Sequence, residues 1–96
     1  MGLFSRKPFS GQYNDEMKRL QDELTQIGKH DDFLSERPGG NFDRECRHIR
    51  TREIGQRIYD IGGADAMEWM IKKISKSLDK NMAAHLEACW LRIGNF

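Results

Sequence analysis

The densest group of charged side chains lies between residues 44 and 57 and contains five arginines: Arg44, Arg47, Arg50, Arg52 and Arg57. Guanidinium groups bind phosphates and carboxylates through paired hydrogen bonds. This group could therefore hold a nucleic acid or an acidic protein. The alternative is a solvated helix face, because Glu53 lies at helical pairing distance from Arg57. No aromatic side chains are interleaved with the arginines, as binders of single-stranded nucleic acid would require.

A second candidate binding surface is centred on Trp69. In a helix this side chain lies opposite the apolar stripe, among the basic residues Lys72 and Lys73. A tryptophan on a polar face must pack against something else. We expect a neighbouring helix, a second copy of the chain or a partner protein to cover it.

The residue types that could support catalysis or bind metal are present, but their spacing does not assemble a site. His85 and Cys89 lie four residues apart and could touch one metal ion, yet a zinc site needs further ligands. No motif places a nucleophile beside a base. The two cysteines, Cys46 and Cys89, lie on expected apolar faces and are predicted to be reduced core thiols. The sequence therefore predicts no catalytic residue, no metal and no cofactor.

Composition limits the remaining function classes. The 96 residues include 16 basic and 15 acidic side chains, so the chain is neither a disordered acidic tail nor a generally basic nucleic-acid binder. No apolar run approaches the length of a membrane span, and no secretory signal is evident. We expect a cytoplasmic protein with a flexible basic segment at 1–11 and a single domain at 12–96.

The elements that carry these residues are predicted to be helices. Valine is absent and there are only two threonines, so strand-forming residues are scarce, while helix formers are abundant. The prediction is an all-α fold without any sheet and with a loop at Pro38-Gly39-Gly40-Asn41. Apolar periodicity gives four main helices, at about Asn14–Ile27, Phe42–Ile61, Ala64–Ser77 and Asn81–Ile93.

Each predicted helix has an apolar face. Expected core residues are Met17, Leu20, Leu24 and Ile27; Phe42, Cys46, Ile49, Ile54, Ile58 and Ile61; Met67, Met70, Ile71, Ile74 and Leu78; and Met82, Leu86, Cys89, Trp90 and Ile93. Gly28 and Gly62 are expected to end their helices in a left-handed conformation.

Three helix ends share one pattern. Ile27-Gly28, Ile61-Gly62 and Ile93-Gly94 follow one another at offsets of 34 and 32 residues, each with apolar residues three and seven positions earlier. This spacing indicates either a helical repeat or separate amphipathic helices that each stop at glycine.

The stretch from Ile61-Gly62-Gly63-Ala64-Asp65-Ala66-Met67 through Leu78-Asp79-Lys80 to Leu86 and Ile93-Gly94 resembles HEAT-like repeats of the short, phycobilin-lyase type. The resemblance covers residues 52–94. It implies a stacked array of antiparallel helix pairs whose concave side holds partners, and no specific chemistry. The alternative architecture is a simple four-helix bundle.

The sequence favours a small non-catalytic protein-interaction module; the alternative is a nucleic-acid or phosphate binder that uses the Arg44–Arg57 helix. Trp90, Leu91 and Phe96 form a candidate interface near the C-terminal end, because a terminal repeat without a polar cap leaves an apolar flank. A homodimer or another protein could cover that flank. Alternatively, residues 1–11, which include Phe9, fold back over it.

Overall fold

The computed structural model describes residues 7–36, 44–46 and 49–96, with segments 34–36 and 44–46 described by their backbone. This part of the chain contains three α-helices and one two-stranded sheet. The elements are a 3₁₀ turn Gly11–Tyr13, α1 Asn14–His30, β1 Leu34–Glu36, β2 Arg44–Cys46, α2 Ile49–Ser77 and α3 Lys80–Cys89. Helices dominate, so the all-α prediction is confirmed.

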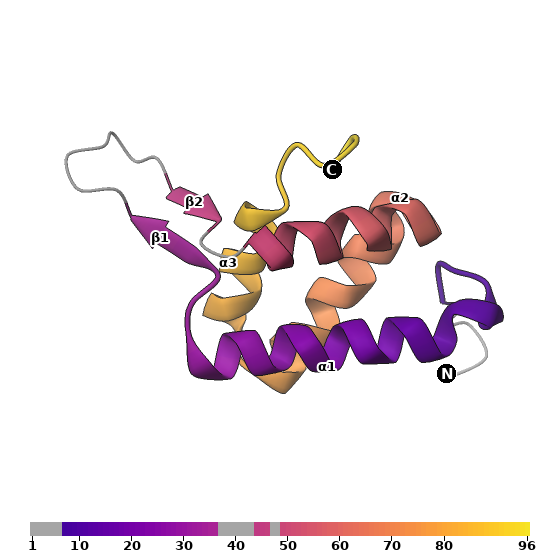
Figure 1. The fold of residues 1–96 in the computed structure, drawn as a ribbon, viewed down its shortest axis with the longest axis horizontal. Helices are drawn as coiled ribbons and strands as arrows, with labels where there is room; N and C mark the ends of the chain where they lie inside the picture. Colours follow the sequence, from indigo (N-terminus) through magenta and orange to yellow (C-terminus); the bar gives the residue numbers. More distant parts are fainter. Residues whose placement is uncertain (1–6, 37–43, 47–48) are drawn as a thin grey trace.

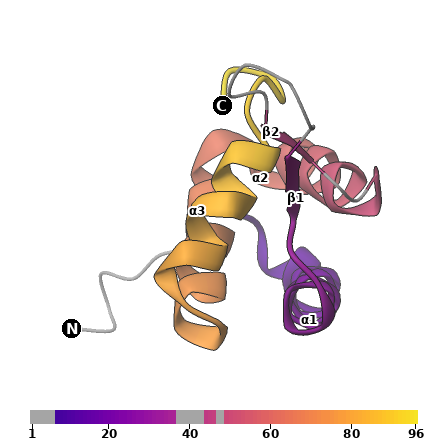
Figure 2. The ribbon, with the colours of Figure 1, turned by 90° about the vertical axis from the view of Figure 1, so that its left-hand side faces the viewer.

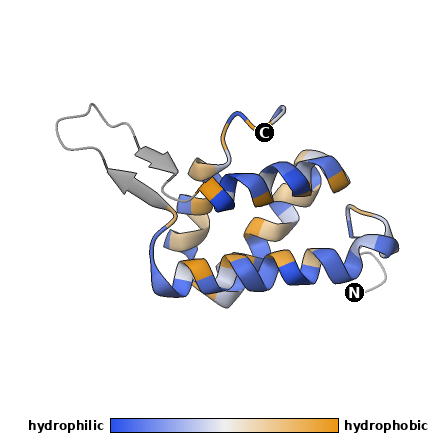
Figure 3. Cartoon of the chain, viewed as in Figure 1, coloured by the Kyte–Doolittle hydropathy of each residue, from blue (hydrophilic) through white to orange (hydrophobic). Residues whose placement is uncertain are grey.

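The helices pack in two layers. α1 and the first half of α2 lie side by side and run in opposite directions, and the second half of α2 lies with α3 behind them (Figure 1). Figure 2 shows the same arrangement from the side, with α1 below the first half of α2. Hydrophobic residues form bands among hydrophilic ones along these helices (Figure 3), and all three contribute to one buried core. The HEAT-like stacking of helix pairs stays a prediction.

α1 forms where the predicted apolar stripe places it and extends beyond the predicted end at Ile27. Met17, Leu20 and Leu24 are buried on one face, and Asp15 and Glu16 stabilise the positive end of the helix dipole. The helix runs to His30, so Gly28 lies inside it and the predicted left-handed cap at Gly28 is wrong.

The structure uses Gly28 for a close packing contact and not for a turn. A Cβ atom at Gly28 would overlap Leu78 Cδ1 and approach Phe33 within 3.2 Å. The glycine therefore makes room for side chains that pack across α1.

A short hairpin follows α1, so the prediction that the chain has no sheet is wrong. β1 and β2 pair antiparallel, with Leu34 opposite Cys46 and Glu36 opposite Arg44. The helix predicted from Phe42 is therefore wrong at Arg44–Cys46, while Phe42 itself lies outside the described residues. The strands flank the predicted Pro38–Asn41 loop. A chain reversal brings backbone groups together, and they can pair even where β-branched residues are scarce.

α2 contains a corner at Gly63. This residue has φ 71° and ψ −163°, which separates a first half from a second half that turns away (Figure 1). The corner lies where the sequence predicts the boundary between two helices. However, the positive φ belongs to Gly63 and not to Gly62. A Cβ atom at Gly62 would instead overlap the carbonyl oxygen of Pro8, so that glycine allows the N-terminal segment to approach the helix.

The first half of α2 buries Ile54 and Ile58 as predicted, whereas Ile49 is 80% exposed. Ile49 is the first residue of the helix. The buried face starts later, at Thr51, whose side chain is fully covered. The prediction that Ile49 belongs to the core is wrong, because it assumed a helix that continued back through residues 42–48.

α3 begins at a well-formed cap, where the carboxylate of Asp79 accepts a hydrogen bond of 2.7 Å from the Met82 amide. The helix ends at Cys89, earlier than predicted, and a series of turns carries Ile93 into the core. Trp90 is fully buried, and its Nε1–H donates a 2.9 Å hydrogen bond to the Thr51 carbonyl. The indole lies on Gly55, where a Cβ atom would come within 2.5 Å of Nε1.

Cys89 is buried, as predicted, but it is not a reduced thiol. It is disulfide-bonded. The side chain of Cys46 lies outside the described residues. Disulfides persist in oxidising compartments and are rare in the cytosol, so this bond weighs against the cytoplasmic prediction.

Candidate functional site

The arginines of α2 are divided among different neighbours. Arg50 forms a bidentate ion pair with Glu23, with N–O distances of 2.6 and 3.0 Å. Two turns further on, Arg57 pairs with Glu16 at 2.6 and 2.9 Å. Both glutamates lie on α1. The two pairs therefore join α1 to α2, and the charge of both guanidiniums is balanced within the fold.

Arg52 points to a third neighbour. Its Nη1 donates to the carbonyl oxygen of Cys89 at 2.5 Å and to that of Leu91 at 3.3 Å. These carbonyls lie at the negative end of α3, where a cation is favourable. Of the other candidates, the side chain of Arg44 and all of Arg47 lie outside the described residues. The described arginines therefore do not form one free basic surface.

The two ion pairs lower the pKa of both glutamates. Hydrogen bonds from Arg57 hold the pKa of Glu16 below its ordinary value of 4.5, and those from Arg50 do the same for the pKa of Glu23. A carboxylate with a depressed pKa in the folded state stabilises the fold above its unfolded pKa. That contribution is lost as the pH falls through the folded pKa.

We expect the double substitution Glu16→Gln/Glu23→Gln to lower the free energy of unfolding at about pH 7 and to have a smaller effect at about pH 2, because the contribution of the native carboxylates declines as the pH falls toward their folded-state pKa. Urea unfolding followed by circular dichroism at both pH values measures this difference. Glu87→Gln, at an exposed position on α3, is the control and should behave alike at both. Equal destabilisation by the double variant at the two pH values would contradict the ion-pair argument.

Trp69 is covered from within the chain, by the N-terminal segment. The ring of Phe9 meets the indole edge-on, with ring centroids 5.0 Å apart and an interplanar angle of 78°. The expected cover was a neighbouring helix, a second copy of the chain or a partner protein; the structure instead places Phe9, from the N-terminal segment 1–11, against the indole. Trp69 remains only partly buried, so the contact leaves part of the indole accessible.

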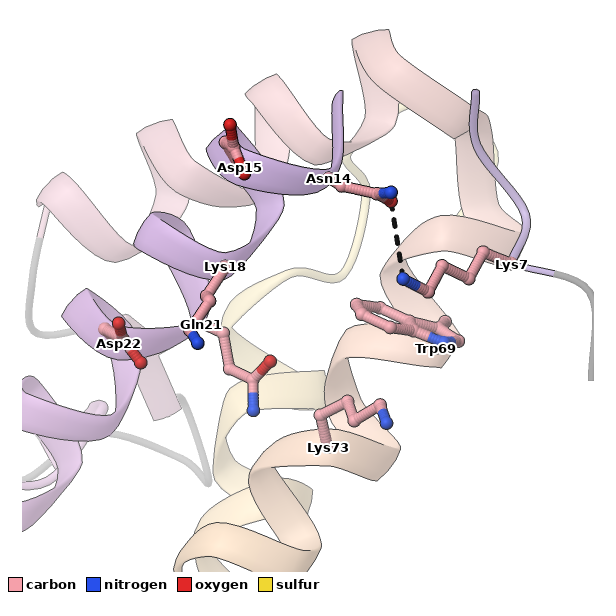
Figure 4. Close-up of a pocket in the computed structure, with 8 residues that line it drawn as sticks. All are labelled: Lys7, Asn14, Asp15, Lys18, Gln21, Asp22, Trp69 and Lys73. Carbon is pink, nitrogen blue, oxygen red and sulfur yellow. Dashed lines mark hydrogen bonds between the residues drawn. The ribbon is translucent and has the colours of Figure 1, made fainter. Parts of the chain in front are cut away.

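A pocket of about 410 Å³ opens beside the indole, between the N-terminal segment, α1 and the second half of α2 (Figure 4). Its lining is polar apart from the tryptophan and consists of Lys7, Asn14, Asp15, Lys18, Gln21, Asp22, Trp69 and Lys73. The ammonium group of Lys73 lies over the indole, 5.2 Å from the ring centroid. Lys7 Nζ donates to Asn14 Oδ1 at 3.4 Å, which holds it at the rim next to Trp69.

This pocket includes two of the predicted site residues, Trp69 and Lys73, but not Lys72, which is exposed on the same helix. Sequence reasoning missed Lys7, Lys18 and Gln21. The last two lie three residues apart on α1, where that spacing places them on one side of a helix. Nothing in the sequence links that side of α1 to Trp69.

Of the three residues in the predicted C-terminal interface, only some have exposed surface. Trp90 has no exposed surface, so its place in an external interface is wrong. Leu91 is 51% exposed, and Phe96 is partly buried against the core. Self-association through this end stays a prediction that rests on Leu91 and on the exposed part of Phe96.

The described residues hold no cluster of three or more metal-ligating side chains. His85, the metal candidate of α3, instead has Nδ1 2.7 Å from Asp32 Oδ1, which connects α3 to the segment after α1.

Within the described ranges, no helix has the length and apolar character needed to cross a lipid bilayer. Comparison of the chain with protein-family models, with curated proteins and with solved structures yields no match. The candidate site is therefore interpreted from its own geometry.

Proposed function

We propose that this chain is a small non-catalytic protein-interaction module that contacts its partner through the Trp69 pocket. The observation that carries the proposal is a partly buried indole at the edge of a pocket formed by three separate segments. Tryptophan is enriched among the residues that dominate binding energy at protein interfaces, because its large ring buries much area at low conformational cost.

The support by Phe9 strengthens this interpretation. The edge-on ring contact holds the indole in place, and a side chain fixed before binding loses less entropy when the partner arrives. The lining offers amide, ammonium and carboxylate groups around the ring. These groups can form the hydrogen-bonded rim that surrounds the apolar centre of an interface.

The alternative, a nucleic-acid or phosphate binder that uses the arginines, receives less support. A nucleic acid draws much of its binding free energy from the counterions that its phosphates release when basic side chains of the protein neutralise them. Arg50 and Arg57 already have carboxylate partners on α1, so a phosphate would have to displace Glu23 or Glu16 first.

Site-specific photo-crosslinking tests the proposed function. A benzophenone amino acid replaces Gln21, which lines the pocket, or Gln26, which lies on the same helix, is exposed and does not line it. We expect the Gln21 variant, irradiated in extract of the native cells, to give a protein adduct that mass spectrometry identifies and that the Gln26 variant does not give. Adducts of equal yield from both positions, adducts with nucleic acid, or none at all would contradict the proposal.

A further inference from the structure

We infer that the segment of the partner that occupies the Trp69 pocket is acidic: an extended peptide with one large apolar side chain against the indole and carboxylates beside it. This inference rests on the proposed function and adds the chemistry of the partner. It follows from which basic groups around the pocket already have a counter-charge and which do not.

The two ammonium groups nearest the indole lack a carboxylate partner. Within the described residues, Lys7 and Lys73 form no ion pair. Lys7 donates only to the neutral amide of Asn14, and Lys73 lies over the ring of Trp69. Figure 4 shows them on opposite sides of the indole, one from the N-terminal segment and one from α2. A ligand on the ring therefore meets positive charge on both sides.

The acidic residues of the lining do not balance that charge. Asp15 and Asp22 lie on α1, and Figure 4 shows their carboxylates on the far side of the pocket from Trp69. They precede and follow Lys18 by three and four residues, the spacings at which helical side chains pair. The lining thus carries three lysines against two aspartates, and its carboxylates lie across the pocket from the indole, whereas Lys7 and Lys73 lie beside it.

Complementary charge gives an interface its selectivity, because juxtaposed like charges repel and disfavour the wrong partner. A basic segment would place its cations against Lys7 and Lys73, whereas an acidic one would satisfy both. The volume of about 410 Å³ is at the small end for ligand pockets, so a short segment fills it. A short peptide with one apolar side chain and a carboxylate on either side would match the indole, the two ammonium groups and the pocket volume.

Selection from a peptide library tests the inference even while the partner is unidentified. A display library of random linear peptides is panned against the whole chain, and the composition of the selected peptides is compared with that of the input. We expect selected peptides to combine an aromatic or large aliphatic residue with adjacent Asp or Glu. Tryptophan fluorescence then measures their affinity, because Trp90 is fully buried and Trp69 is the responsive indole.

Three variants make the result specific. Lys73→Glu is expected to weaken binding of a selected peptide at least about tenfold, because it turns an attraction into a repulsion. Lys72→Glu is the matched control, since it changes net charge equally at an exposed position outside the lining, and should weaken binding less than about threefold. Trp69→Ala, followed by calorimetry, should weaken binding at least about tenfold. Circular dichroism confirms that each variant is folded.

The outcomes separate the inference from the proposed function. Peptides that depend on Trp69 but are neutral or basic overturn the acidic inference and leave the interaction module in place. Acidic peptides that bind Lys73→Glu and Lys72→Glu equally well also overturn the inference, because the charge then acts elsewhere. If no peptide is selected, or if binding is indifferent to Trp69→Ala, the pocket is not a peptide-docking site and both statements fail.

Discussion

Substitution of Trp90 by alanine is expected to lower the free energy of unfolding by about 3–5 kcal/mol, the range for removing a large buried aromatic side chain. Trp90 is fully buried at the junction of α3 and α2. Its loss leaves a cavity over Gly55 and takes away the donor that satisfies the Thr51 carbonyl. A domain of this size has a total stability of about 5–15 kcal/mol, so the variant should be near the limit of folding. Urea unfolding followed by circular dichroism measures the effect.

Two further variants check the cause. Trp90→Phe keeps a buried ring but removes the indole N–H, and it should have an intermediate effect. Trp69→Ala removes the same side chain type from a partly exposed position, and it should cost clearly less than Trp90→Ala. If the two alanine variants were equally stable, Trp90 would not hold α3 against α2 in the way described.

Substitution of Gly63 by alanine should cost about 1–3 kcal/mol through backbone strain alone. The combination of φ 71° and ψ −163° is essentially restricted to glycine. Nothing lies within 4 Å of a Cβ atom built at Gly63, so a steric clash contributes nothing. Either the corner opens or the strain is retained, and both lower the free energy of unfolding. Thermal or urea unfolding of the variant gives the value.

Gly11→Ala is the matched control. A Cβ atom there meets only Asn14 Nδ2, at an ordinary 3.9 Å, and Gly11 has no positive φ. This variant should be as stable as the original chain or slightly more stable, because alanine restricts the unfolded state. If Gly63→Ala were equally harmless, the corner of α2 would not depend on the glycine.

The sequence predicted the helices well where an apolar stripe runs through one packed face. The stripe of Met17, Leu20 and Leu24 places α1, and Ile54 and Ile58 place the first half of α2. It failed at Arg44–Cys46, where a chain reversal lets two short segments pair whatever their propensity. It also placed the positive φ at the wrong glycine of a Gly-Gly pair. Gly62 instead faces the Pro8 carbonyl, a contact from another part of the chain that the local sequence does not reveal.

The candidate site was predicted only in part, for a similar reason. The unusual position of Trp69 on its helix can be read from local periodicity, and so can its neighbour Lys73. The rest of the pocket comes from segments about 50 to 60 residues earlier in the chain, including Gln21 and Lys7. Their proximity to Trp69 depends on how α1 packs against α2, which periodicity within one helix does not specify.

The ion pairs between α1 and α2 also affect how the chain folds during its synthesis. Glu23 and Arg50 are 27 residues apart, and Glu16 and Arg57 are 41 apart. At about 5–20 residues per second, translation reaches Arg57 roughly 2–8 seconds after Glu16. Most of the stability of a helix in a protein comes from packing of its apolar face, and the apolar face of α1 has no partner until α2 emerges. The nascent N-terminal third is therefore expected to be a substrate for chaperones, and a translational pause before residue 57 would prolong that exposure.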